Sequence, residues 1–383
     1  MITVAFAGDI APCGAFESLV LKKQQRIFGD TLPILESADL AFGNLECPLT
    51  NHAGKINKSG PALKADPGCA TALTVFSVLG LANNHILDFG KKGLEETIES
   101  CRRAGIPTVG AGSTLSQAQA PFMKKVKGLT VALIALAEHE FNQSENGGAG
   151  SAPIDGIDTY RQIMEARSQA DIVIVTLHAG NEYFAYPRPG LRKLCHHYID
   201  LGAEAVVCHH PHVPGAYEYY KGKPVIYSLG NFIFDTAAPP EGWDRGFLAQ
   251  LHFDEKNGRL ETLELIPYCQ SVPAGGVNML RGAEREALLA RLEGYRKNLE
   301  DHEGWMQEWR KFVKAQSNLY LMRQYLPLLT RGRGFLAGKL PFLGDLFFSN
   351  RSCDLDKLNM LRCQSHRELL TAVLESRSRP RGE

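Results

Sequence analysis

The chain has 383 residues, 44% of them hydrophobic, and its 42 basic and 42 acidic residues give a formal net charge of zero. This length and composition suit one large globular domain or two. The balanced charge gives no electrostatic reason to expect nucleic acid as the main partner, and no run of eighteen apolar residues predicts a transmembrane helix.

The N-terminal residues MITVAFAGDI are typical of a first strand and not of a signal peptide, because they contain no basic segment and no small-residue cleavage site. The nine cysteines include no C-x-x-C pair, which favours reduced thiols over a disulfide framework. From these two features we expect a cytoplasmic protein.

From residue 1 to about 235, short apolar runs alternate with amphipathic stretches, which indicates an α/β domain. The runs are rich in Val, Ile, Leu and Ala, as expected for strands that are covered on both faces. We predict strands at 2–8, 38–43, 76–82, 129–137, 171–177, 203–208 and 224–229. Helical spacing predicts helices at 91–105, 159–170 and 189–202.

The following segment differs, because two alternating runs between residues 246 and 268 flank Asn257-Gly258. That dipeptide between such runs predicts a β-hairpin. We expect the hairpin to complete a main domain at residues 1–280.

Residues 281–383 are predicted to form a helical C-terminal extension, with helical patterns at 283–316 and 355–376. Between them, residues 318–348 place Leu, Phe and Tyr beside Arg and Lys. One interpretation is a lid or a surface for peripheral membrane contact. The other, which we favour, is a helical layer that completes the core while its basic side chains extend to water.

Almost every predicted strand is followed by a polar side chain that can bind a metal. These residues are Asp9, Asn44, Glu46, Asn84, His85, His178, His209, His210, His212 and Asn231. In an open, mostly parallel α/β sheet, ligands bind outside the carboxyl ends of the strands, so these side chains are expected to meet at one edge. A mixed nitrogen and oxygen set suits Zn, Mn, Fe or Ni better than a thiolate site would.

Each motif taken alone is also typical of turns and helix caps. His139 follows a strand and is a further candidate for the same cleft. His196 and His197 lie in an amphipathic helix, where a solvated face is the simpler explanation. Four other histidines have no comparable setting and are set aside: His52, His252, His302 and His366.

The segments AGDI, GNLECPLT, LANNHILDFG, GIPTVGAG, LHAGNEY, VVCHHPHV and YSLGNFIFD, in this order, resemble the CapA family. These are capsule or poly-γ-glutamate synthesis proteins, related to the calcineurin-like metallophosphoesterases. The resemblance covers residues 2–250. It implies an α/β fold in the form of a four-layer α/β/β/α sandwich, in which two central sheets carry helices on their outer faces.

The resemblance also implies a site for two divalent metal ions, with Mn, Zn or Fe expected. By position in the motifs, the metal ligands would be Asp9, Glu46, Asn84, His178, His210 and His212. Glu46 would bridge the two ions. The wider superfamily's D-x-H motif has Ala11 in place of its histidine, so the first ion would have fewer protein ligands.

His85 is implied to face the substrate without binding metal, and to act as a catalytic acid. Asp88 is the second catalytic candidate, because it could hold the His85 ring in one tautomer. Its alternative role is an N-cap for a helix that starts near Gly93. The candidates for substrate binding are Asn44, Glu182, His209 and Asn231.

Three functions remain open. The first is a dinuclear metal-dependent hydrolase in which the ions generate hydroxide from water for attack on a phosphoester. The second is an enzyme of capsule or poly-γ-glutamate metabolism that acts on an amide-linked or sugar-linked polymer. The third is a non-enzymatic accessory factor in assembly of such a polymer. The expected partner of the site is an anionic small molecule or polymer.

Overall fold

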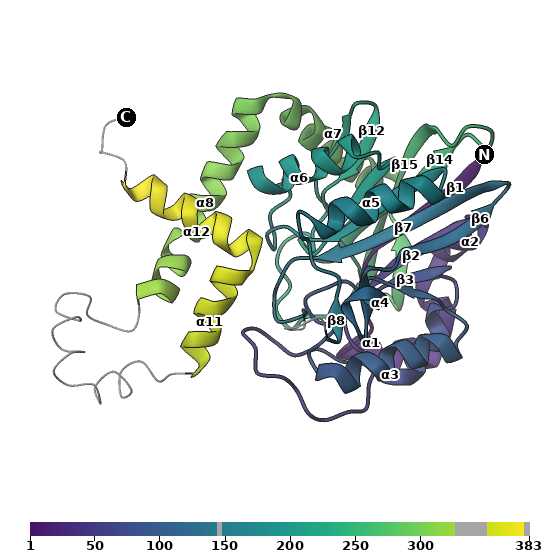
Figure 1. Cartoon of the computed structure of the whole chain (residues 1–383), viewed down its shortest axis with the longest axis horizontal. Helices are drawn as coiled ribbons and strands as arrows, with labels where there is room; N and C mark the ends of the chain where they lie inside the picture. Colours follow the sequence, from purple (N-terminus) through teal and green to yellow (C-terminus); the bar gives the residue numbers. More distant parts are fainter. Residues whose placement is uncertain (144–147, 326–350, 379–383) are drawn as a thin grey trace.

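The computed structural model describes residues 1–143, 148–325 and 351–378 (Figure 1). Its core consists of two β-sheets that pack face to face, with helices on the outer face of each sheet. This is the four-layer α/β/β/α sandwich expected from the sequence, so the predicted fold class is confirmed.

Within the described ranges the first sheet has eight strands in the order β16-β15-β14-β1-β2-β3-β4, and β13 pairs with β1 as well. Their bounds are β1 (Ile2–Ala11), β2 (Leu40–Leu45), β3 (Val78–Gly80), β4 (Thr108–Val109), β13 (Asn231–Phe234), β14 (Arg245–Phe253), β15 (Leu260–Ser271) and β16 (Gly276–Met279). The predicted hairpin around Asn257-Gly258 is the antiparallel pair β14 and β15.

The second sheet has six strands in the described chain, in the order β11-β12-β10-β9-β7-β6. Their bounds are β6 (Phe122–Val126), β7 (Leu129–Ala137), β9 (Ile172–His178), β10 (Ala205–His209), β11 (Tyr217–Tyr220) and β12 (Lys223–Ile226). A separate short pair consists of β5 (Ala111–Gly112) and β8 (Gly150–Ser151).

The two-residue period of the strands separates the inner core from the outer cores. Along β1, Val4 and Phe6 pack between the sheets, whereas Ala5 and Ala7 pack in the cluster on the other face. Along β9, Ile172 likewise belongs to the core between the sheets. Continuous apolar runs were therefore the correct signal for strands that are covered on both faces.

Helices cover the two outer faces. Helices α1 (Ala15–Lys23), α2 (Leu32–Ser37) and α3 (Gly90–Arg103) contribute side chains to the cluster on the first sheet. Helices α4 (Leu115–Gln119), α5 (Asp158–Gln169) and α6 (Pro189–Asp200) contribute to the cluster on the second sheet. Two 3-10 helices span Gln24–Thr31 and Pro67–Leu73.

The predicted strands are all present, but several boundaries differ from prediction, and two of these differences affect the site. The strand predicted at 224–229 ends at Ile226, and Asn231 begins the separate strand β13 instead of ending a strand. In addition, β1 continues past Gly8 to Ala11. Gly8 permits this, because a Cβ atom there would lie 2.0 Å from the carbonyl oxygen of Gly230, which accepts a hydrogen bond from the Asp9 amide.

The described part of the C-terminal segment is helical and packs against the sandwich. Helix α7 (Gly282–Glu300) inserts Leu288 and Leu292 into the core between the sheets. Helices α8 (His302–Tyr325), α11 (Arg351–Arg362) and α12 (Gln364–Ser378) lie beside the sandwich at the end away from the N-terminus (Figure 1). They form a smaller apolar cluster with Phe184.

None of the helices in the described ranges combines the length and apolarity needed to cross a membrane. Of the stretch 318–348, for which peripheral membrane contact was considered, residues 326–348 lie outside the described residues. The cysteines whose side chains are described are free thiols.

Candidate metal centre

The polar side chains at the strand ends of both sheets lie close together. The first sheet supplies Asp9 from β1, Glu46 directly after β2 and Asn84 after β3. The second sheet supplies His178 at the end of β9 and the histidines that follow β10. The six candidate metal ligands therefore come together at the edge shared by both sheets, and not at the edge of one open sheet.

Asp9 lies within β1, at a point where the strand pairing is irregular. The register shifts on both sides of it, between Phe6 and Asp9 against β2 and between Asp9 and Ile10 against β13. Such bulges redirect side chains and are common beside active sites. The Asp9 carboxylate accepts hydrogen bonds from the Asn44 amide at 2.8 Å and from the backbone amide of His210 at 3.1 Å.

The segment H-H-P-H leaves β10 in an unusual backbone conformation. His210 has a φ of 97° and His212 a φ of 62°, both in the left-handed region that non-glycine residues rarely adopt. Backbone strain of this kind is found where the surrounding structure requires a particular side-chain direction. Here it places both imidazoles in the same buried site, with ring centroids 5.6 Å apart.

The ligand atoms form two overlapping groups, and within each group they lie within 4.8 Å of one another. One group contains Asp9, Glu46 and His178, and the other contains Glu46, His210 and His212. Glu46 belongs to both, which is the position required of a bridging carboxylate. The Asn84 amide oxygen lies 3.0 Å from Nε2 of His178, beside the same groups.

The surroundings of Glu46 suit a carboxylate that binds a cation. Its side chain is 0% exposed, and neither carboxylate oxygen has a hydrogen-bond partner in the described structure. The nearest imidazole nitrogens, on His178 and His212, lie 3.5 and 3.6 Å from Oε1. Burial and the negative charge of Asp9 raise the pKa of Glu46 well above its usual value. A buried charge without a partner is costly, so this carboxylate fits a metal ligand.

The neighbouring groups fit the same explanation. Burial and the facing His210 ring lower the pKa of His178 well below its usual value, so this imidazole is neutral, the form that binds metals. Burial raises the pKa of Asp9, but the hydrogen bond with His209 and the attraction of that ring outweigh burial and hold the pKa below the usual range. Neutral imidazoles and carboxylates together form a donor set for divalent transition metals.

Three of the four predicted substrate-binding residues lie behind this donor set and do not line the cavity. Asn44 donates to Asp9 and lies 3.2 Å from Nδ1 of His178. His209 contacts Asp9 at 3.1 Å, and Asn231 contacts Nδ1 of His212 at 3.0 Å. Their positions suit orientation of the ligands, as groups behind metal ligands typically do, and not substrate contact. The fourth, Glu182, lines the cavity.

His85 and Asp88 form a pair at the cavity. Nδ1 of His85 lies 2.7 Å from the Asp88 carboxylate, which also accepts hydrogen bonds from Lys58 and from the backbone amide of Leu63. Helix α3 begins at Gly90, and its cap position is Phe89 with no side-chain cap bond. Asp88 therefore orients His85 and does not cap the helix. Burial and Lys58 lower the pKa of His85.

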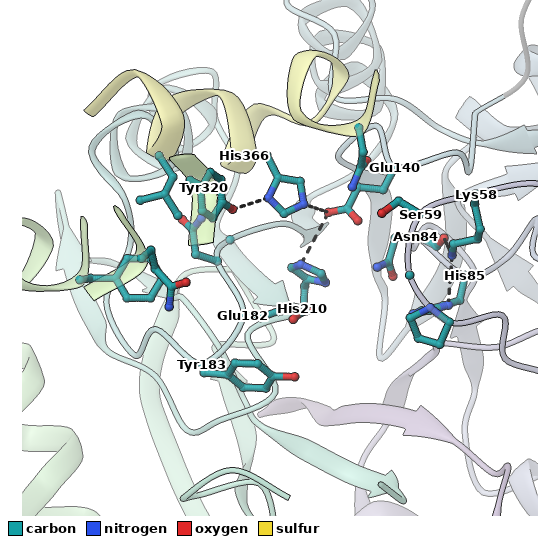
Figure 2. A pocket seen from close by; sticks show the side chains of 18 residues that line it. Lys58, Ser59, Asn84, His85, Glu140, Glu182, Tyr183, His210, Tyr320 and His366 are labelled. Carbon is teal, nitrogen blue, oxygen red and sulfur yellow. Dashed lines mark hydrogen bonds and ion pairs between the residues drawn. The ribbon is translucent and has the colours of Figure 1, made fainter. Parts of the chain in front are cut away.

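A cavity of about 450 Å³ opens next to the candidate ligands (Figure 2). The sandwich contributes Lys58, Ser59, Gly60, Pro61, Asn84, His85, Glu140, Gly180, Asn181, Glu182, Tyr183 and His210. The C-terminal helices contribute Phe312, Gln316, Tyr320, Asn359, His366 and Leu369. The cavity thus lies between the candidate metal ligands and the C-terminal helices.

The sequence analysis missed several residues of this cavity. His366 was set aside, yet it lies 3.7 Å from Glu140. His139 was a candidate, but it is the neighbouring Glu140 that lines the cavity. The available signal for Glu140 was its position three residues after β7, the same setting as the polar residues that follow the other strands. For His366 no local signal existed, because it is remote in sequence from every strand end.

Comparison with known proteins gives a consistent set of relatives. The profile described as "Bacterial capsule synthesis protein PGA_cap" matches residues 3–236. The chain is 32% identical over 275 residues to the PGA biosynthesis protein CapA of Bacillus subtilis. That alignment covers 67% of this chain and 69% of the relative. It is also 30% identical over 283 residues to the capsule biosynthesis protein CapA of Bacillus anthracis. That alignment covers 70% of this chain and 67% of the relative.

Among solved structures, a phosphatase from Mycoplasma pneumoniae aligns with a TM-score of 0.46 at 15% identity, over 72% of this chain and 95% of that one.

Proposed function

The chain belongs to the bacterial capsule synthesis protein PGA_cap family, and from that premise we propose that it is a hydrolase that uses two divalent metal ions. The ions are Mn, Zn or Fe, held by Asp9, Glu46, Asn84, His178, His210 and His212. The substrate is an anionic small molecule or polymer with a phosphoester or an amide link, connected with capsule or poly-γ-glutamate metabolism.

The observation that carries this proposal is the Glu46 carboxylate. It is buried, has no hydrogen bond in the described structure and is shared by two groups of metal-binding side chains. A protein that only needed a stable core would be expected to bury an apolar side chain at this position, since an unpaired buried charge costs folding energy. Divalent ions held by these two groups of side chains would remove that cost.

When bound, such ions neutralise charge on the group under attack and lower the pKa of water towards about 7. The residues of this chain would supply the remaining requirements. Asn44, His209 and Asn231 would hold the ligands in place. His85, kept in one orientation by Asp88 and Lys58, would hydrogen-bond the attacked group or protonate the leaving group, a role typically worth about 10²–10⁴-fold in rate.

The position of the cavity supports hydrolysis over a purely structural metal. Asn84, His85 and His210 line the cavity, so a substrate placed there would reach the metal centre directly. A structural metal site is normally closed by protein ligands on all sides, whereas a catalytic one keeps a position open. The arrangement is compatible with phosphate or amide substrates, because attack by hydroxide suits both.

The decisive experiment uses the full chain, reconstituted separately with Mn, Zn and Fe. Metal content is measured first, and then hydrolysis of a phosphomonoester, a phosphodiester and a γ-glutamyl substrate. Glu46→Gln is the matched control, because it keeps the size of the side chain and removes the bridging charge. We expect metal-dependent turnover of at least one substrate class in the wild type and its loss in Glu46→Gln. A wild-type protein that binds no metal would refute the proposal.

The alternative is a non-enzymatic accessory factor in assembly of capsule polysaccharide or poly-γ-glutamate. It is favoured by the names of the two Bacillus relatives, which refer to biosynthesis and not to hydrolysis. It predicts a metal-loaded protein without turnover of any of these substrates that nevertheless binds a poly-γ-glutamate chain. Turnover and equilibrium binding to that polymer, measured on the same metal-loaded protein, therefore separate the two functions: binding without turnover favours the accessory factor, and turnover favours the hydrolase.

A further inference from the structure

A second cluster of metal-binding side chains lies at the cavity wall, apart from the six ligands above. It consists of Glu140, Cys363 and His366. Glu140 follows β7 of the sandwich, whereas Cys363 lies between α11 and α12 and His366 lies in the first turn of α12. The cluster therefore joins two parts of the chain that are more than two hundred residues apart in sequence.

The distances in this cluster match a tetrahedral ion. Sγ of Cys363 lies 3.3 Å from Oε1 of Glu140, and Nε2 of His366 lies 3.7 Å from the same oxygen. The three ligand atoms all lie within 4.8 Å of one another. Bonds of about 2.0–2.3 Å to a tetrahedral zinc ion separate neighbouring ligand atoms by roughly 3.3–3.5 Å. The two separations from Oε1 of Glu140 are therefore close to those of a tetrahedral site, and the three side chains can supply three of its corners.

The His366 ring is already oriented for such a role. Its Nδ1 lies 2.6 Å from the hydroxyl of Tyr320, and its Nε2 points towards Glu140 (Figure 2). Metal-binding histidines commonly use their second ring nitrogen in a hydrogen bond that fixes the ring and the tautomer. Tyr320 supplies that contact from α8, so the ring is held before any ion binds.

The chemistry of the surroundings favours a cation. The Cys363 side chain is 0% exposed, and the polar atoms beside its thiol are carboxylate oxygens, of Glu140 at 3.3 Å and Glu138 at 3.6 Å. Glu138 is neutralised by an ion pair with Arg188. In the described structure Glu140 has no lysine or arginine within ion-pair distance, only histidines. A thiol, an imidazole and an unneutralised carboxylate together suit zinc.

We propose that Glu140, Cys363 and His366 hold a Zn²⁺ ion, additional to the two ions of the catalytic centre. On binding, the thiol proton of Cys363 leaves to solvent and the thiolate becomes a ligand. Because Glu140 and His366 line the cavity, the fourth ligand comes from the cavity, as water or as an oxygen of a bound molecule. The ion also fastens α11 and α12 to the sandwich, since its ligands come from both parts.

The test uses the full chain loaded with Co²⁺ in place of zinc. A cobalt–thiolate bond gives a strong charge-transfer absorption in the near ultraviolet, and the proposed catalytic ligands include no cysteine. We expect the wild type to show this band and Cys363→Ser to lose it. When the two proteins are loaded with zinc instead, Cys363→Ser should bind about one ion per chain less than the wild type. Cys269→Ser, a half-buried cysteine in β15, is the matched control and should keep both the band and the zinc.

Two further variants make the result independent of folding and of the proposed function. If Cys363→Ser does not fold, Tyr320→Phe should keep the band but weaken Co²⁺ binding about 10-fold, as expected for loss of a group behind a ligand. Glu46→Gln should lose metal from the catalytic centre and keep the cobalt–thiolate band. A wild type without the band, or a band that survives in Cys363→Ser, would overturn the proposal, whatever the protein hydrolyses.

Discussion

His210 contacts Glu140 with one ring nitrogen and His178 with the other: Nε2 lies 3.9 Å from Oε1 of Glu140, and Nδ1 lies 3.1 Å from Nε2 of His178. The ring therefore lies between the candidate metal ligands at the sheet edges and the cluster of Glu140, Cys363 and His366 that the C-terminal helices complete.

Replacement of His178 or His210 by alanine should remove most of the bound divalent metal. Each substitution removes an imidazole from one of the two groups that share Glu46, so that group loses its ion, and the shared carboxylate then holds the other ion less well. Elemental analysis after reconstitution with Mn, Zn or Fe measures the loss. His197→Ala, on helix α6 and outside the centre, is the control and should retain wild-type metal. Equal metal content in all variants would disprove the ligand assignment.

His85→Ala should leave metal content nearly unchanged and reduce turnover by at least about 10²-fold, the usual effect of losing a general acid. His85 contacts Asp88 and Lys58 and belongs to neither group of ligands around Glu46. Asp88→Asn should reduce turnover less, because the ring stays and loses only its orientation. Metal content and kcat of the same preparations provide the test. A fall in metal as large as in His210→Ala would show that His85 is a ligand.

A chain that ends at residue 280 should be insoluble or unstable. We propose a boundary at this residue between the sandwich and the C-terminal extension, but the extension covers apolar surface on the sandwich. Leu288 and Leu292 of α7 fill the core between the sheets, and Leu299 packs on the second sheet. Their loss would expose a contiguous apolar patch. The measurements are the solubility, metal content and liposome flotation of residues 1–280 and of the full chain. A folded, metal-loaded core that has lost only flotation would instead favour a membrane-docking role for the C-terminal extension.

Arg188→Met should destabilise the protein by roughly 3–5 kcal/mol, the usual cost of breaking a buried ion pair from one side. Arg188 is buried and pairs with Glu138 and with Glu368 of α12, so its removal leaves the buried Glu138 carboxylate without a cationic partner in the described structure. Arg102→Met, at an exposed ion pair on α3, should have little effect. Denaturant unfolding of the two variants measures the difference, and equal midpoints would contradict the prediction.

The stability contributed by Glu218 should decrease in acid. Burial raises the pKa of this carboxyl, but hydrogen bonds from His196 and Arg192 outweigh burial and lower it to about 2. A carboxyl whose folded pKa is depressed stabilises the fold at pH values above its unfolded pKa of about 4.3, and the contribution disappears as pH falls towards the folded pKa. Glu218→Gln should therefore be less stable than wild type at pH 7, and the gap should close between about pH 4 and pH 2. Thermal unfolding across this range tests it.

The sequence by itself determined the strands and most candidate ligands. Asp9, Glu46 and His178 could be found because each lies at or near the end of an apolar run. The end of such a run is a local feature of the sequence, and it can be recognised without knowing how the sheets are arranged. The order of the motifs was enough to indicate the family and hence two sheets instead of one. The hairpin at Asn257-Gly258 was likewise a local property of a turn dipeptide.

The tertiary structure alone decided which polar residues face the cavity. His209 and Asn231 belong to the same motifs as the ligands, yet they lie behind Asp9 and His212. The direction of a side chain depends on strand twist, on bulges and on residues in the left-handed region, and a sequence pattern does not predict these. Glu140, Cys363 and His366 meet only because α12 packs against the segment after β7. That contact depends on burial of apolar surface between segments far apart in the chain, a non-directional force that leaves no local signal in the sequence.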